Sequence, residues 1–420
     1  MFTNTFAPVV GGIETSVAAF AEDLAEAGHD LLVATLQEGD GDRDCPGVLR
    51  LPGLLGGESS FASTPNLFSK LDAFAPDLLH VHQPFLLGRA ARRYAAARSL
   101  PLAYTHHTLY DRREDLPHLD ALAGLEQSTR ALAVRYSSLC DAVIAPTGSI
   151  AEILADQGIG HPIDIVPTGI DTAAFAGDDR AAFRQRHGIP ADAFVVGHLG
   201  RLVPAKRIGF LAEAIAAFLT THPDAHALVC GEGECAASLR SLFDSSGLAD
   251  RLVLLGHLPP PQLADAYAAM DLFTFASLTD TQGIVLLEAM AAGVPVLALH
   301  ATGPQDLVIH GETGWLLDPA SSSAVFAQAI AAATSPDARH AASVAARRHA
   351  ASFHRRLCAE RLHSIYRRIA DPPAAPRPDP TGLDDTFDRV ESEWRSLAAA
   401  GEALRSLLPS RGFPIPFGFV

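Results

Sequence analysis

The chain has 420 residues, a length that exceeds what one hydrophobic core usually serves, and 48 % of the residues are hydrophobic. These values predict two domains, each with its own core. Its 32 basic and 48 acidic side chains give a formal net charge of −16, which argues against a nucleic-acid partner. No apolar run reaches about 18 residues without a charge and no signal peptide is visible, so we expect any membrane contact to be peripheral. Five cysteines without a disulfide framework favour a reduced, cytoplasmic protein.

The first half of the chain alternates between predicted strands and helices. The earliest helix is predicted over Thr15 to Ala27, behind the turn at Gly11 and Gly12, a pair that fits either a simple turn or a close approach of backbone to ligand. Only Met1 to Thr5 remain for the strand that should precede this turn, so we expect the natural chain to start before Met1. Further strands are predicted at Leu31–Leu36, Leu78–Val81, Leu102–Thr105, Ala142–Ala145 and Asp164–Val166.

The second half repeats this alternation. We place the domain boundary in the segment from Pro167 to Ala193, and we expect a last helix near Ser352 to Ile369. The strands of this half are predicted at Phe194–Leu199, Ala227–Cys230, Leu252–Leu255, Leu272–Phe275 and Val294–Leu299.

A polar loop and helix between Ser277 and Pro295 form the most informative segment. The loop follows a buried strand, and we expect its Ser, Thr and Asp residues to cap a helix that Gly293 ends. Free backbone N–H groups at such a helix N-terminus bind phosphate. Asp280 in the loop and Glu288 in the helix could accept hydrogen bonds from hydroxyls on two parts of one ligand, although Asp280 alone fits an N-cap equally well.

A rare lysine lies in a second loop of the same half. Lys70 and Lys206 are the only lysines among the 32 basic residues, and Lys206 follows the predicted strand that ends at Leu199, with Arg201 five residues before it. An ammonium beside a planar guanidinium suits a leaving diphosphate, whose negative charge grows as a bond to it breaks. The alternative is that Lys206 is a solvated loop residue without a functional role, which is lysine rather than arginine by chance.

Together these segments resemble glycosyltransferase family 4, and the resemblance covers roughly residues 1 to 370. It rests on the order and spacing of six motifs: G-G-I-E at Gly11–Glu14, T-H-H-T at Thr105–Thr108, V-P-T-G-I-D at Val166–Asp171, G-R-L-V-P-A-K at Gly200–Lys206, G-E-G-E at Gly231–Glu234, and the run from Asp280 to Glu288.

The resemblance implies an α/β protein of the GT-B fold, with two Rossmann-like domains facing across a cleft. Residues 1–170 would form the acceptor-side domain and 171–350 the nucleotide-sugar domain. A helix over 351–370 would cross back and pack on the first domain. Residues 371–420 lie beyond the resemblance, and their composition and apolar spacing predict a Pro-rich spacer and an amphipathic tail helix.

The resemblance also assigns roles to particular residues. Arg201 and Lys206 would bind the donor diphosphate, Asp280 the transferred sugar and Glu288 the ribose, with His107 beside the transferred sugar. The family usually has glutamate where this chain has Asp280, and among 18 histidines His107 alone would fit a structural role equally well. Further substrate contacts are expected from Gly11, Gly12, Glu14, Leu258, Thr281, Gln282, Gly283 and Ile284.

The chemistry implied by the family is transfer with retention and without a metal or other cofactor, because the leaving diphosphate helps to take the acceptor proton. The acids Asp40, Asp42 and Asp44 lie in a Gly-rich segment and fit a solvated turn better than a ligand set. Cys230 and Cys235 are too far apart in sequence for the usual zinc pair.

Two short strings, T-D-T-Q-G at Thr279–Gly283 and H-T-L-Y-D at His107–Asp111, look most like the diacylglycerol glucosyltransferase branch of the family. They favour a hexosyltransferase that uses UDP-glucose or a similar donor and a lipid acceptor at the inner face of the membrane. A soluble or polysaccharide acceptor is the main alternative. A sugar-nucleotide epimerase, or a nucleotide-sugar binder without activity, is the alternative from another class.

Two charged features remain open. Arg89, Arg92, Arg93 and Arg98 fall on one predicted helix, which could be a solvated face or could bind an anionic surface. In the tail, an apolar stripe from Leu383 to Leu408 has acidic neighbours, so we expect it to dock on protein rather than on anionic lipid, within the chain or in a dimer. The partner surface expected for it is Arg347, Arg348, Arg355, Arg356, Arg361, Arg367 and Arg368.

Overall fold

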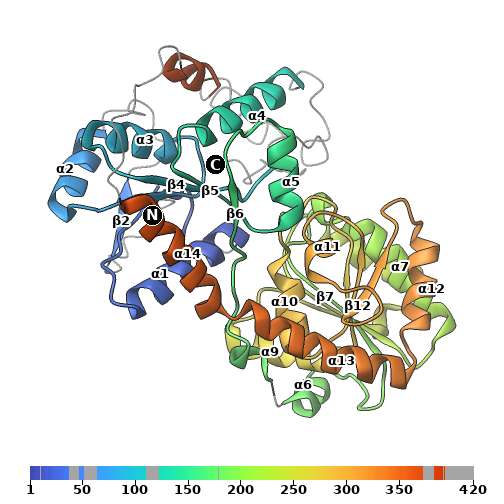
Figure 1. The fold of residues 1–420 in the computed structure, drawn as a ribbon. Coiled ribbons are helices and arrows are strands. Elements are labelled where there is room, and N and C mark those ends of the chain that lie inside the picture. The colour runs from blue at the N-terminus through green and yellow to red at the C-terminus, as the bar shows by residue number, and fades with distance from the viewer. Residues whose placement is uncertain are drawn as a thin grey trace. The chain divides into compact units, whose positions relative to one another are not determined.

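The computed structural model describes residues 1–9, 11–36, 47–51, 64–109, 123–177, 179–371, 383–390 and 392. The chain divides into two compact units (Figure 1). Unit 1 consists of Met1–Gly169 together with Arg355–Val420, and unit 2 is the continuous segment Ile170–His354. Within the described residues, no helix is both long and apolar enough to span a bilayer.

Unit 1 contains parallel strands in two ladders. One ladder pairs β1 with β2, and the other has the order β3-β4-β5-β6. The strands are β1 Val33–Leu36, β2 Val48–Leu51, β3 Leu79–Val81, β4 Leu102–Thr105, β5 Ala142–Ala145 and β6 Ile163–Ile165.

The first three residues lie between β1 and β3 as a strand would. Phe2 forms parallel bridges to Ala34 and Val81. Its backbone N–H donates to the His80 carbonyl at 2.8 Å, and its carbonyl accepts from the N–H of His82 at 2.9 Å. This short segment therefore joins the two ladders into one hydrogen-bonded layer.

Helices cover both faces of this layer, because alternate strand residues point to opposite sides. Ala103 and Ile144 pack with α1 and α14, whereas Tyr104 and Val143 pack with α2, α3, α4 and α5. α14 is held against α1 by Arg355, which bonds to Asp23 at 2.6 Å. The helices are α1 Gly12–Glu26, α2 Thr64–Phe74, α3 Leu87–Arg98, α4 Ala123–Ser137, α5 Gly148–Asp156 and α14 Arg355–Ala370.

Unit 2 contains a single six-stranded parallel sheet with the order β12-β11-β10-β7-β8-β9. The chain builds outward from β7 in one direction and then from β10 in the other, so a topological switch point lies between these two strands. The strands are β7 Val195–Leu199, β8 His226–Cys230, β9 Leu252–Leu255, β10 Leu272–Phe275, β11 Val296–Leu299 and β12 Gly314–Leu317.

Two apolar clusters bury the faces of this sheet. Phe273 and Val296 pack on the side of α6, α9, α10 and α13, whereas Leu272 and Leu297 pack on the side of α7, α8 and α12. The helices are α6 Arg180–Arg186, α7 Ile208–Thr221, α8 Ala236–Ser245, α9 Pro260–Ala269, α10 Ile284–Ala291, α11 Pro304–Leu307, α12 Ser323–Ala332 and α13 Pro336–Ala350. Short 3₁₀ turns are η3 Ala173–Phe175, η4 Pro204–Lys206, η5 Ala249–Arg251 and η6 Ala351–Phe353.

The predicted α/β class is confirmed, with both units Rossmann-like in plan. The sequence reading missed two edge strands, β2 and β12, which have only four residues each. β12 opens on Gly314, where a Cβ atom would lie 2.1 Å from the Val296 carbonyl oxygen. Gly314 is thus required because β12 pairs closely with β11, although a glycine in the sequence suggests a turn.

The tail helix docks within the chain. Residues 383–390 are helical, and Leu383, Phe387 and Val390 are buried in the core of unit 1. The Phe387 ring meets Phe85 and Tyr136 edge-on, with centroids 6.0 and 6.3 Å away. Figure 1 shows this short helix, at the red end of the colour bar, beside α3 and α4.

The arginines that hold the tail are those of α3. The Arg89 side chain bonds to Asp384 at 2.9 Å and to Asp388 at 2.6 Å, and Arg92 bonds to Asp384 at 3.0 Å. Both arginines are about 4 % exposed. The open question about the α3 arginines is therefore settled for these two, which are buried in ion pairs.

The partner surface expected for the tail was wrong. Arg347 and Arg348 belong to α13 in unit 2, and Arg355 and Arg368 of α14 are paired with Asp23 and Asp164 instead. The rest of the predicted stripe, including Trp394, Leu397, Leu404 and Leu408, lies outside the described residues.

Asp384→Asn should loosen the tail, because Asp384 is the carboxylate that both Arg89 and Arg92 contact, and Arg89 keeps only its bond to Asp388 on this helix. Removing one partner of a buried ion pair costs up to about 3–5 kcal/mol. We expect limited proteolysis to cut between residues 372 and 392 at least about tenfold faster than in the unaltered chain. The control is Asp385→Asn at the adjacent exposed carboxylate, which should leave the rate unchanged. Equal rates for the two variants would contradict the docking.

Candidate functional site

Three loops of unit 2 converge at the carboxyl ends of neighbouring strands. They follow β7, β8 and β10, the three strands around the switch point of the sheet, where open α/β sheets bind their ligands. The loops carry G-R-L-V-P-A-K at Gly200–Lys206, G-E-G-E at Gly231–Glu234, and the polar segment from Ser277 to Gly283.

Glycines allow the first two loops to touch through their backbones. The N–H of Gly200 donates to the Cys230 carbonyl at 3.0 Å, and that of Leu202 donates to Glu232 at 2.7 Å. A Cβ atom at Gly231 would lie 1.9 Å from the Gly200 carbonyl oxygen, and one at Gly233 would lie 2.3 Å from that of Leu202. Both glycines also have positive φ values, so larger side chains would push the loops apart.

Lys206 and Asp280 meet across the loops after β7 and β10. The ammonium of Lys206, at the end of η4, donates to the Asp280 carboxylate, and the two side chains are 18 % and 17 % exposed. The Ser277 hydroxyl also donates to the Ala205 carbonyl at 3.3 Å and ties the same two loops together. The structure thus brings together a cation and an anion that lie 74 positions apart in the sequence.

The prediction that polar residues of this loop cap the following helix was wrong. The N-cap of α10 is Gly283, with φ of +82°, a residue that has no side chain to cap the helix. Ile284 is its first residue, and Thr281 and Gln282 precede the cap. Since the first N–H groups of a helix need acceptors, this end of α10 suits an anion such as phosphate.

Glu288 lies one turn inside α10 and has a different partner from Asp280. It accepts a hydrogen bond from the Tyr267 hydroxyl of α9 at 2.7 Å. Burial raises the pKa of the Glu288 carboxyl above its usual value, and the tyrosine bond offsets part of this rise. The two carboxylates are therefore oriented separately, which allows them to hold separate parts of one ligand.

The other predicted residues of unit 2 lie on the same loops or beside them. Arg201 follows Gly200 and is exposed, and Leu258 lies just before α9 and is half-buried. The backbone of the Asp280 loop is fixed from behind by Gly303, where a Cβ atom would lie 2.7 Å from the Asp280 carbonyl oxygen and 2.8 Å from that of Gln282.

Sequence reasoning missed two residues near these loops. One is Tyr267, whose hydroxyl orients Glu288. The other is His198, buried at the end of β7, where its Nδ1 atom is 2.9 Å from the Thr274 carbonyl of β10. Burial lowers the His198 pKa to about 4, so this ring is neutral at pH 7. The sequence signal that could have identified His198 is its position two residues before Gly200.

Unit 1 carries the remaining predicted residues. Gly11 is the extended N-cap of α1, Gly12 is its first residue, and Glu14 lies in its first turn. The Thr5 hydroxyl donates to the Glu14 carboxylate, which fixes Glu14 at the end of the N-terminal strand segment. His107 follows β4 and is half-buried.

Four histidines lie within or directly after β3 and β4, and three of them, His80, His82 and His107, are in contact. The rings are those of His80, His82, His106 and His107, and the Nδ1 atom of His82 is 2.9 Å from Nε2 of His107. Burial lowers the pKa of all four, that of His106 to about 3 and that of His107 to about 4. The cluster is therefore uncharged at neutral pH.

Among the described residues, no group of three or more His, Cys, Asp or Glu side chains is arranged to hold a metal ion. Cys140, Cys230, Cys235 and Cys358 are free thiols. The acids Asp40, Asp42 and Asp44, together with Cys45, lie outside the described residues.

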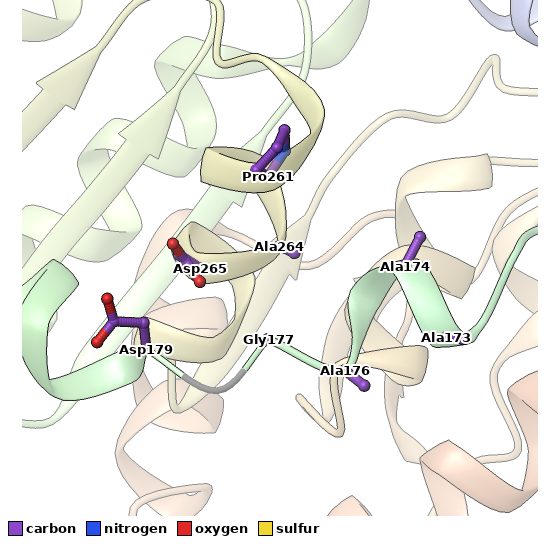
Figure 2. Close-up of a pocket in the computed structure, with 8 residues that line it drawn as sticks. All are labelled: Ala173, Ala174, Ala176, Gly177, Asp179, Pro261, Ala264 and Asp265. Atoms are coloured by element: carbon purple, nitrogen blue, oxygen red, sulfur yellow. The ribbon is translucent and has the colours of Figure 1, made fainter.

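A cavity of about 520 Å³ in unit 2 lies away from the predicted residues. It is formed by η3, the segment after it and α9 (Figure 2). Asp179 and Asp265 are its charged lining residues, so it offers no cation to a diphosphate. The lining is Ala173, Ala174, Ala176, Gly177, Asp179, Pro261, Ala264 and Asp265.

Sequence comparison assigns both halves of the chain to glycosyltransferase models. The model described as Glycosyl transferases group 1 matches residues 179–349, and the one described as Glycosyltransferase Family 4 matches residues 10–174. A D-inositol 3-phosphate glycosyltransferase of Acidothermus cellulolyticus is 30 % identical over 393 residues, 85 % of each chain. An alpha-monoglucosyldiacylglycerol synthase of Acholeplasma laidlawii is 26 % identical over 333 residues, which are 75 % of this chain and 83 % of the relative.

Solved structures share the fold. The Anabaena protein HepE in complex with UDP-glucose matches with a TM-score of 0.70 and 22 % identity, over 88 % of this chain and 98 % of that one. Sucrose-phosphate synthase from Thermosynechococcus elongatus matches with a TM-score of 0.71 and 22 % identity, over 87 % and 97 %. The expected GT-B fold is confirmed.

Glu288→Gln should stabilise unit 2 at pH 7, because the folded-state pKa of Glu288 is raised by burial. As the pH rises, the Glu288 carboxyl ionises in the unfolded chain before it ionises in the folded chain. Its contribution therefore lowers the free energy of unfolding as the pH rises, until the pH exceeds the pKa of Glu288 in the folded chain. Glutamine removes that cost and can still accept from Tyr267.

The measurement is the thermal unfolding midpoint at pH 7 and at about pH 4. Glu288→Gln should raise the midpoint at pH 7, and the gain should shrink at the lower pH. Glu312→Gln, at an exposed carboxylate of the same unit, is the matched control and should show no such pattern. A gain of equal size at both pH values would contradict the burial cost.

Proposed function

This chain belongs to glycosyltransferase family 4. We propose that it transfers a hexose, and glucose before other hexoses, from a nucleotide sugar to a lipid acceptor such as diacylglycerol. The anomeric configuration is retained and no metal ion takes part. Support for a lipid acceptor comes from the strings Thr279–Gly283 and His107–Asp111 and from similarity to alpha-monoglucosyldiacylglycerol synthases. Reaching a lipid acceptor requires peripheral contact with the inner face of the membrane.

The observation that carries this proposal is the Lys206–Asp280 pair in the loops that lead to the N-terminus of α10, where the cap residue is Gly283. In the structure, Asp280 pairs with Lys206. When a donor binds, its diphosphate takes the place of the carboxylate beside the ammonium, and Arg201 and the first N–H groups of α10 add further positive potential. Asp280 then becomes available to accept hydrogen bonds from hydroxyls of the transferred sugar.

Chemistry follows from the charge that develops as the glycosidic bond breaks. Negative charge grows on the leaving diphosphate, and Lys206 and Arg201 stabilise it more strongly in the transition state than in the ground state. Glu288, oriented by Tyr267, accepts from the ribose hydroxyls and holds the nucleotide. The departing diphosphate oxygen takes the proton of the acceptor hydroxyl. His107 contacts the transferred sugar.

A soluble acceptor is the second candidate, because one relative at similar identity is named a D-inositol 3-phosphate glycosyltransferase. Other relatives are named GDP-mannose-dependent alpha-mannosyltransferases, which makes GDP-mannose an alternative donor. The test is a panel of UDP- and GDP-sugars against diacylglycerol vesicles and against soluble sugars and inositol phosphate. Transfer to vesicles supports the proposal, and transfer only to soluble acceptors replaces it. Release of free nucleotide without any acceptor would indicate an epimerase or hydrolase instead.

Lys206→Ala should lower turnover by about a hundredfold, because one charge contact to a transition-state anion typically contributes about 3 kcal/mol. Arg201→Ala should have an effect of the same order. Lys70→Ala, at the other lysine of the chain and exposed on α2, is the control and should retain activity. Near-normal turnover in Lys206→Ala would refute the role of this residue.

Asp280→Asn and Glu288→Ala should separate sugar binding from nucleotide binding. Asparagine at 280 releases Lys206 from its ion pair, so UDP or GDP should bind as tightly as before or more tightly while transfer is lost. Alanine at 288 should weaken binding of the same nucleotide, since it removes the ribose contact. Calorimetric titration with the nucleotide decides the matter, and equal losses of affinity in both variants would show that the roles are not divided.

A further inference from the structure

His82 lies beside His107 but belongs to none of the motifs that predicted the site. It follows β3 and is 1 % exposed. Its Nδ1 atom is 2.9 Å from Nε2 of His107, and the two rings are nearly parallel, with centroids 5.1 Å apart and an angle of 24° between their planes. The two imidazoles therefore share one hydrogen bond.

The His82 ring is held from the other side. His80 lies against it, with ring centroids 4.2 Å apart. Both nitrogens of His80 have partners, since Nδ1 is 2.6 Å from the Tyr366 hydroxyl of α14 and Nε2 is 2.7 Å from the Thr105 hydroxyl of β4. The backbone N–H of His82 is also fixed, because it donates to Phe2. His82 therefore offers its Nδ1 atom to His107 from a fixed position.

Only one proton can lie between the two rings. Burial lowers the pKa of both histidines, so at neutral pH each carries a single ring proton. In one arrangement, Nδ1–H of His82 donates to Nε2 of His107, and His107 carries its own proton on Nδ1. In the other, Nε2–H of His107 donates, and the His82 proton lies on its Nε2 atom.

The surroundings of His82 distinguish these arrangements. Its Nε2 atom is buried and has no hydrogen-bond partner in the described part of the chain. The second arrangement would leave a buried N–H donor unsatisfied there, and orphaned buried N–H groups are rarer than under-satisfied acceptors. The first arrangement leaves only a bare acceptor at that position.

We infer that His82 is a positioning residue that donates from Nδ1 to His107 and thereby holds His107 in the tautomer protonated on Nδ1. In this tautomer the Nδ1 atom of His107 is a donor rather than an acceptor. This inference rests on the proposed function, in which His107 contacts the transferred sugar. A fixed tautomer determines which hydrogen bonds the His107 ring can make in the reacting complex, without a change of its charge.

The direct test is nitrogen NMR of the full chain with ¹⁵N-labelled histidine, in which the two ring nitrogens of His107 are assigned by loss of their signals in His107→Gln. In the unaltered protein, His107 should be protonated on Nδ1. In His82→Leu the signals should move toward the Nε2–H tautomer or a mixture. In His82→Asn, whose amide nitrogen lies near the original Nδ1 position, the Nδ1–H tautomer should persist.

Activity provides a second readout. His82→Leu should lower kcat at least tenfold with little change in KM for the donor, and His82→Asn should recover most of the loss. His106→Leu is the matched control, because His106 is equally buried but bonds to Ser137, and it should leave the His107 tautomer unchanged. Protonation of His107 on Nε2 in the unaltered protein, or an unchanged tautomer in His82→Leu, would overturn the inference.

The tautomer is read without substrate, so it can fail independently of the proposed function. Unchanged transfer in His107→Ala would refute the role of His107 in the reaction, whatever the NMR spectrum shows.

Discussion

The ion pair between Lys206 and Asp280 is the interaction on which the site of unit 2 depends. It joins the loop after β7 to the loop after β10, at the one place in the sheet where the strand order reverses. Close contacts at Gly231, Gly233 and Gly303 fix the backbones around it. The pair is a cation and an anion that are both partly buried, and a diphosphate with an attached sugar can bind to the two of them separately.

Around this pair, the protein uses neutral buried groups to orient charged ones. Tyr267 fixes Glu288, and His198 packs uncharged beneath the loops. Unit 1 follows the same pattern with four uncharged histidines, each hydrogen-bonded to a hydroxyl or to another ring. In both places, uncharged side chains fix the orientation of their neighbours without adding charge.

The sequence predicted those parts of the site whose signals are local. A lone lysine after a strand and an acidic loop before a helix were enough to place Lys206, Asp280 and Glu288 at one edge of the sheet. It could not predict the partners of Arg89, because Asp384 lies 295 positions away. Nor could it show that Tyr267 faces Glu288, since a tyrosine on an apolar helix face reads as core. β2 and β12 were also missed, although the edge strands β6 and β9, which are no longer than these, were predicted.

Hydrogen exchange with and without nucleotide sugar would test the central claim most directly. With whichever of UDP-glucose and GDP-mannose binds more tightly, the loops at 200–206, 231–234 and 277–284 should exchange more slowly, because the ligand fills the space above the Lys206–Asp280 pair. The alanine-lined cavity between η3 and α9 should show no change. Protection confined to residues 173–179 and 261–265, with none at the three loops, would contradict the assignment of the donor site.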